Sequence, residues 1–81
     1  MEALIYKSNG DVEEYTGGDT LSEWQGAIGG GYIEPVTMRD HVMFVDEEGM
    51  LKDLPYNEQA SILVGFRIRG DALLLPKSRV K

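Results

Sequence analysis

The stretch HVMFVDEEGMLKDLPYNEQASIL, residues 41–63, decides the fold, because it holds the most apolar strand candidate, a tight turn and the clearest helix start. Residues 41–45 form a nearly continuous apolar run between charged residues, which is typical of a central strand covered on at least one face. In Asp46-Glu47-Glu48-Gly49 the aspartate can accept main-chain N–H bonds and the glycine can take a positive φ, which predicts a bulged hairpin turn. Residues 50–52 are then expected to pair back as a strand.

A short helix is expected after this turn. Asn57 is a favourable N-cap ahead of the acidic Glu58, and Gly65 predicts a left-handed C-cap. A helix of about two turns is unstable in water by itself. Its apolar side must therefore pack on the sheet, and the residues expected there are Ala60, Leu63 and Val64.

The N-terminal third predicts a hairpin followed by another helix. Residues 3–7 have strand composition, Asn9-Gly10 favours a type I′ turn, and the return strand at residues 12–15 alternates as a half-covered strand near an edge does. Thr20 and Glu23 match a capping box. Leu21, Trp24 and Ile28 then fall on one helix face, with Trp24 expected in the core.

The remaining strands complete an α+β pattern. Residues 32–37 read as a strand whose Pro35 belongs at an edge or bulge. Residues 66–69 alternate cleanly, and residues 72–75 supply a last apolar strand. The order ββαββ(β)αββ predicts an antiparallel or mixed sheet of five to seven short strands with both short helices on one face. We expect one α+β domain over residues 1–76 and a basic, flexible tail over 77–81.

Composition narrows the class of protein. The chain has 81 residues and no cysteine, which excludes disulfides and thiolate chemistry and, with no signal peptide, predicts a location in a reducing cytoplasm. No apolar run approaches the roughly 18–20 residues of a membrane span. Three of the 8 basic residues lie in the last five positions, which leaves 5 against 14 acidic residues over 1–76, a net −9. Such a body repels phosphates, so direct nucleic-acid binding is not expected.

Several short blocks resemble a small domain family of unknown function carried mainly by bacteriophages, plasmids and other mobile elements. The blocks are GGGYIEP at 29–35, VDEEGMLKDLPYN at 45–57, EQASIL at 58–63 and RGDALLL at 69–75. Pro35 departs from the family pattern and puts regular pairing of that strand in question. The resemblance implies a mobile-element origin and no established activity. Short proteins from such genomes often bind and disable a host component.

Catalytic and metal-binding groups are scarce. His41 is the single histidine, and its neighbour Asp40 would point to the opposite face of a strand, so we interpret His41 as a surface or edge residue. Asp46, Glu47 and Glu48 lack the alternating spacing of a calcium loop. We interpret these three residues as a solvated turn that adds to an acidic surface. We predict that the chain is not an enzyme and that it binds no metal and no cofactor.

Candidate contact residues are few. Arg67 and Arg69 would share one strand face and either neutralise nearby carboxylates or anchor an anionic ligand or an acidic partner. Asn57 can read a polar ligand edge beside Tyr56, although an N-cap role is the commoner one. The candidate contacts are Tyr32, Glu34, Tyr56, Asn57, Arg67 and Arg69.

Three functions follow as hypotheses. The first is a non-enzymatic module that inhibits a host defence protein by protein–protein contact through its acidic surface. The second is a homo-oligomeric sponge that buries a nucleotide signal between subunits, using Arg67, Arg69, Asn57 and Tyr32. The third is a DNA-mimic inhibitor, which ranks lower because the acidic residues cluster at turns.

Overall fold

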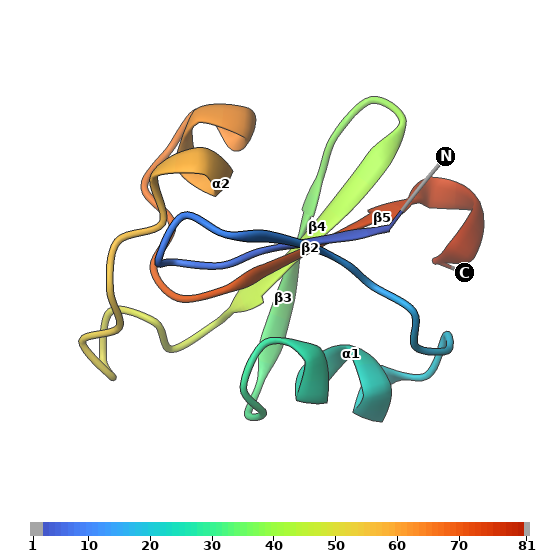
Figure 1. The fold of residues 1–81 in the computed structure, drawn as a ribbon, viewed down its shortest axis with the longest axis horizontal. Helices are drawn as coiled ribbons and strands as arrows, with labels where there is room; N and C mark the ends of the chain where they lie inside the picture. Colours follow the sequence, from blue (N-terminus) through green and yellow to red (C-terminus); the bar gives the residue numbers. More distant parts are fainter. Residues whose placement is uncertain (1–2, 81) are drawn as a thin grey trace.

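The computed structural model describes residues 3–80 and shows an α+β fold built on one five-stranded antiparallel sheet (Figure 1). The strand order is β2-β1-β5-β4-β3, so the last strand in the sequence lies in the middle and joins two hairpins. The elements are β1 Leu4–Tyr6, β2 Val12–Glu14, α1 Leu21–Ala27, β3 Ile33–Thr37, β4 His41–Asp46, α2 Glu58–Val64, β5 Ala72–Pro76 and the 3-10 turn Lys77–Arg79.

The two helices lie on opposite faces of the sheet, so the prediction that both cover one face is wrong (Figure 1). Val42 and Phe44 of β4 belong to the core beneath α1, whereas Met43 and Val45 belong to the core beneath α2. Successive strand residues point to opposite faces, so β4 and its neighbour β5 are buried on both sides. Their continuous apolar runs are the pattern of strands covered on both faces.

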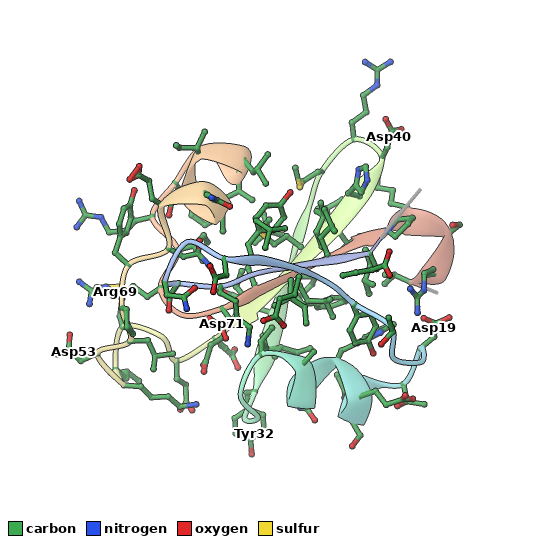
Figure 2. All side chains as sticks on the ribbon, viewed as in Figure 1. Asp19, Tyr32, Asp40, Asp53, Arg69 and Asp71 are labelled. Atoms are coloured by element: carbon green, nitrogen blue, oxygen red, sulfur yellow. The ribbon has the colours of Figure 1, made fainter. Side chains whose placement is uncertain are left out.

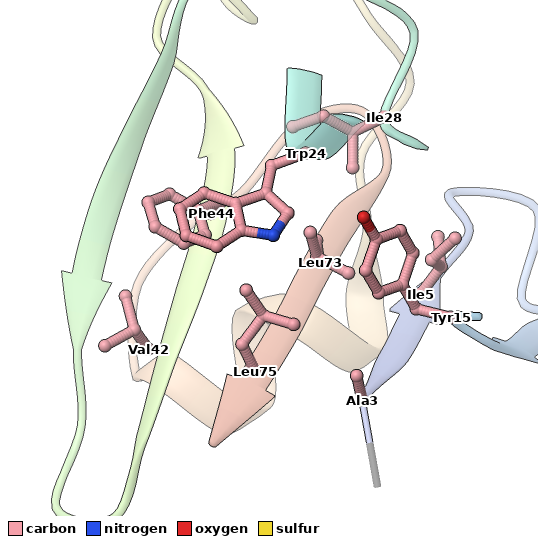
Figure 3. Close-up of a cluster of buried hydrophobic side chains, with 9 residues drawn as sticks. All are labelled: Ala3, Ile5, Tyr15, Trp24, Ile28, Val42, Phe44, Leu73 and Leu75. Carbon is pink, nitrogen blue, oxygen red and sulfur yellow. The ribbon is translucent and has the colours of Figure 1, made fainter. Parts of the chain in front are cut away.

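The core beneath α1 is organised around an aromatic pair. The rings of Trp24 and Phe44 stack with centroids 4.9 Å apart, and Ile28 packs beside them (Figure 3). The predicted core position of Trp24 is confirmed, but Leu21 is 58% exposed because the seven-residue helix presents only part of its surface to the sheet. Gly26 faces open space, with no atom within 4 Å of an added Cβ.

Both predicted helix starts are confirmed. The Thr20 hydroxyl accepts the Glu23 N–H at 3.2 Å, and the Asn57 side chain accepts the Ala60 N–H at 3.1 Å. Gly65 ends α2 at a φ of 84°, in the left-handed region that glycine favours. Leu63 departs from expectation, since it is 43% exposed while Ala60 is fully buried.

Two of the expected strands are absent from the described residues 3–80. Residues 50–52 continue the turn instead of pairing back, because Leu54 N–H donates to the Gly49 carbonyl and Lys52 N–H to that of Glu48. Residues 66–69 form a single antiparallel bridge, between Tyr56 and Arg69. The alternation in this segment imitates a strand, but main-chain pairing stops at that bridge.

The first hairpin closes differently from the type I′ turn that Asn9-Gly10 favours. Only Gly10 in this turn has a positive φ, at 99°, and its N–H donates to the Lys7 carbonyl. A type I′ turn needs positive φ at both central residues. One left-handed residue is enough here because Lys7 N–H also pairs with the Asp11 carbonyl and widens the loop.

Pro35 lies where its missing N–H costs nothing, as expected for an edge strand. Met38 N–H donates to His41 and Glu47 N–H to Tyr32, so even-numbered β3 residues point their main-chain groups at β4. Odd-numbered residues such as Pro35 point theirs away from the sheet. Proline is tolerated at such outward positions.

The C-terminal residues predicted as a flexible tail have a defined place up to Val80. Residues 77–79 form a 3-10 turn, and the Arg79 guanidinium binds the Asp19 carboxylate and the Gly17 carbonyl while lying 5.5 Å from the Tyr15 ring centroid. Val80 packs on the core beneath α1. Lys81 lies outside the described residues. Within residues 3–80, neither helix has the length or apolar character needed to cross a membrane.

Candidate functional site

A groove lies on the α2 side of the sheet, where the β3–β4 hairpin meets the turn after β4 and the segment 66–69. Its volume is about 190 Å³. It brings together five of the residues singled out in the sequence, which come from three separate segments of the chain. Those five are Glu34, Asp46, Glu47, Arg67 and Arg69, and the other lining residues are Val45, Gly49, Met50, Phe66 and Ile68.

Asp46 supports the groove from inside and does not belong to an acidic surface. Its side chain is 3% exposed and accepts from Lys52 Nζ at 3.0 Å and from the Glu48 N–H at 2.8 Å. These bonds hold the turn after β4 in place. Of the other two acidic residues in this turn, Glu47 is exposed and lines the groove, whereas Glu48 is half-buried and does not line it.

The two arginines line the groove in different states. Arg67 is exposed, and no hydrogen bond joins its side chain to residues 3–80. Arg69 Nη1 donates to Asp53 Oδ1 at 3.1 Å and to the Leu54 carbonyl at 3.4 Å, on the left of Figure 2. Arg69 Nε is buried with no partner in the described chain. Arg69 therefore combines a structural role with an unused donor.

Asn57 is a structural residue whose side-chain amide is already engaged within the fold. It is 1% exposed, and its Nδ2 donates to the carbonyl oxygens of Tyr6 and Gly70, both at 2.8 Å. Its Oδ1 accepts from Ala60, and its own N–H donates to Ile68. Both amide hydrogens and the acceptor are thus used inside the fold.

The two candidate tyrosines lie outside the groove. Tyr32 is 68% exposed and precedes β3, with its carbonyl bound to Glu47 N–H (Figure 2). Tyr56 is 50% exposed and lines a second hollow with Ile62, Phe66 and Arg67. Because Phe66 and Arg67 line both hollows, Tyr56 is continuous with the groove and Tyr32 is not.

Sequence reasoning named Tyr56 as a candidate contact but missed the other large apolar side chains exposed on this side of the molecule. Met50, Tyr56, Ile62 and Phe66, here called the apolar strip, are 80%, 50%, 73% and 54% exposed. The first and last border the groove, and the last three border the second hollow. Met50 was expected in a strand and Phe66 in another, where alternate residues are covered. Met50 and Phe66 are exposed because neither strand forms, and no local sequence pattern indicates that these strands are absent.

The chemistry of the groove suits recognition. Its lining combines carboxylates, guanidinium groups and apolar side chains, which can form ion pairs, hydrogen bonds and apolar contacts with a bound molecule. Within residues 3–80, no three His, Asp or Glu side chains are grouped so as to hold a metal ion.

The resolved pKa shifts lie on the α1 side of the sheet. Burial, followed by the nearby Glu23 carboxylate, raises the pKa of Tyr15. The hydrogen bond from the Thr20 hydroxyl, followed by one from the Gly18 N–H, lowers the pKa of Glu23. Both pKa shifts therefore arise around the start of α1, away from the groove.

Comparison with known proteins places this fold in a family. No curated protein and no solved structure matches the chain. The one family model found covers residues 1–78, nearly the whole sequence. The chain therefore belongs to the family described as Domain of unknown function (DUF3846).

Proposed function

We propose that this protein is a non-enzymatic binding module that inhibits a host macromolecule, most simply a host defence protein, by protein–protein contact. The observation that carries the proposal is the apolar strip, four large side chains at least half exposed along two adjoining hollows. Contiguous exposed apolar residues with a polar rim are characteristic of interaction surfaces. Aromatic residues and arginine are also the side chains that most often dominate binding energy.

Charge indicates the kind of partner. Glu34 and Glu47 line the groove beside the apolar strip, and the net charge of residues 1–76 is −9. A basic partner surface would be attracted at long range, and its association rate would fall with salt. The proposed contact surface is acidic, as expected from the sequence, but Asp46 does not belong to it. The resemblance to mobile-element proteins supports a partner encoded by the host.

The test is affinity capture with matched variants. The tagged chain is exposed to a bacterial host lysate, and the captured protein is then measured quantitatively against Phe66→Ala combined with Arg67→Glu. We expect this double variant to lose capture, because it removes the shared centre of both hollows. Leu21→Ala is the control, since Leu21 is 58% exposed on the other face of the sheet.

The outcomes separate clearly. Capture that survives the double variant, or that the control removes equally, contradicts a contact through the apolar strip. Capture that is insensitive to salt contradicts the role given to the carboxylates. Inhibition of the captured protein's own activity then separates an inhibitor from a passive binder.

The nucleotide sponge is a second candidate, favoured by one observation. Arg69 Nε is buried without a partner beside Arg67 and Phe66, a combination that suits an anionic aromatic ligand. Against it, the groove of about 190 Å³ is smaller than the roughly 300 Å³ at which small-molecule pockets begin, so a second subunit would have to complete it. Calorimetry with cyclic nucleotides and ADP-ribose tests this candidate. If none of these ligands gives a binding heat, the nucleotide sponge is ruled out.

A further inference from the structure

The two edges of the sheet are not equivalent. On β3, the outward main-chain position at the middle of the strand is Pro35, which has no N–H to offer a further strand. On β2, Tyr15 N–H donates to Ala3 and Lys7 N–H to Asp11, so odd-numbered residues face β1. The β3 edge is thus blocked to a further strand, whereas the β2 edge is open to one.

Two residues of β2 present unused main-chain groups. By the same alternation, Val12 and Glu14 point both their N–H and C=O groups away from β1. No hydrogen bond within residues 3–80 involves these groups. An edge of this kind is a template on which an extended segment can add as a further strand.

A hollow beside this edge indicates which side chains such a strand would carry. Glu13 points to the α1 side, as its partner Ile5 does, and both line a hollow with Tyr15, Glu23 and Ala27. Ile5 and Ala27 contribute apolar atoms to this hollow, and Glu13, Glu14 and Glu23 contribute carboxylates. A side chain directly opposite Glu13 on an added strand would lie on the same face, above this hollow.

We propose that the β2 edge binds an extended segment of a partner protein that carries lysine or arginine opposite Glu13. The methylene stem of that residue would lie over the hollow, and its charged end would meet Glu13 and Glu23. One of its sequence neighbours would lie opposite Val12, which is 46% exposed, and would be apolar, whereas the other would lie opposite Glu14. The surface lies at the opposite edge of the sheet from the groove and does not depend on the function proposed there.

Charge argues against a second copy of this chain as the occupant. If two copies paired so that Val12 and Glu14 of each satisfied one another, Glu13 would lie directly opposite its own counterpart. Like charges opposite each other on antiparallel strands destabilise the pair. The same position opposite a lysine or arginine is favourable, which selects a basic segment.

The experiment uses the full chain labelled with ¹⁵N and a seven-residue peptide that alternates lysine with valine. We expect amide shifts confined to residues 11–16 and to the residues lining the hollow beside Glu13. Glu13→Lys should weaken binding about fivefold, the equivalent of removing one favourable cross-strand charge pair and adding an unfavourable one. Val12→Pro removes an outward donor, as Pro35 does on β3, and should weaken binding about threefold or more.

The controls match these changes. Asp40→Lys alters the net charge as Glu13→Lys does, but in the exposed β3–β4 turn (Figure 2), and should leave binding unchanged. A peptide that alternates glutamate with valine should not bind. Shifts elsewhere or none at all, equal loss with Asp40→Lys, or equal binding of the glutamate peptide would overturn the proposal. So would a dimer seen by sedimentation that Val12→Pro converts to a monomer.

Discussion

Asn57 Nδ2 lies 2.8 Å from the main-chain oxygen of Tyr6, a residue 51 positions earlier in the chain. The same nitrogen donates to Gly70, and the Oδ1 atom of the side chain caps α2 at Ala60. One amide therefore fastens the α2 start to β1 and to the turn before β5. The residue looks like an ordinary helix cap in the sequence but joins three parts of the fold.

Asn57→Ala should lower the free energy of unfolding by about 2–4 kcal/mol, since it removes a cap and leaves two buried carbonyls without donors. Asn57→Asp should be about as damaging, because carboxylate oxygens would then face those carbonyls. Urea denaturation measures both. Asn9→Asp is the control and should cost under about 0.5 kcal/mol, because Asn9 is exposed and its acceptor is retained. Equal stability of Asn57→Asp and wild type would show that the amide donors contribute nothing.

Gly26→Ala should stabilise the protein by about 0.5–1 kcal/mol, because alanine favours the helix and an added Cβ meets no atom within 4 Å. Gly65→Ala, with equally open space but a φ of 84°, should destabilise it. Thermal denaturation of the pair separates helix propensity from left-handed strain. Stabilisation by both substitutions would contradict the left-handed C-cap.

Glu23 should make stability depend on pH. Hydrogen bonds from the Thr20 hydroxyl and the Gly18 N–H lower its pKa in the folded state below the usual 4.5, so its contribution is present above that value. It is lost as the pH falls through the lowered folded pKa. Glu23→Gln should therefore reduce the dependence of the free energy of unfolding on pH in that acidic window. In Thr20→Val the carboxyl should titrate nearer 4.5 by NMR, and an unchanged titration would rule out the hydroxyl as the main cause.

Pro35→Thr should leave the β3–β4 pairing intact while it opens the blocked edge. The position faces outward, so the fold loses no hydrogen bond and stability should change by less than about 1 kcal/mol. A restored donor on an edge strand favours self-association. Analytical ultracentrifugation should show more association than in wild type at equal concentration. A strictly unchanged sedimentation profile would mean that Pro35 does not protect this edge.

Local signals in the sequence were sufficient where one or two neighbouring residues decide the structure. The capping box at Thr20, the caps at Asn57 and Gly65, and the edge position of Pro35 all follow from chemistry within a few residues. The α+β class followed as well, because strand-like and helix-like periods differ clearly.

The errors arose where distant contacts decide. The runs in β4 and β5 are apolar on both faces, so they could not tell which side each helix would cover, although continuity itself favoured two-sided burial. Alternation in residues 66–69 predicted a strand. Pairing beyond one bridge, however, depends on the direction that the chain takes after α2.

Only part of the candidate site could be predicted, because distant contacts decide which residues meet there. Arg67 and Arg69 were predicted as a pair, and Glu34 and Glu47 were named separately from them, yet the meeting of all four in one groove depends on the turn held by Asp46. Within the apolar strip, Tyr56 was predicted as a contact, but Met50 and Phe66 were not, because their exposure is decided by which strands fail to form.

The central position of β5 has a consequence for synthesis on the ribosome. Until residues 72–76 emerge, the nascent chain holds two unconnected hairpins, and an isolated hairpin is marginally stable in water. The domain should therefore become resistant to proteolysis in a single step, when residues 72–76 leave the exit tunnel, and truncation before β5 should leave no folded remnant.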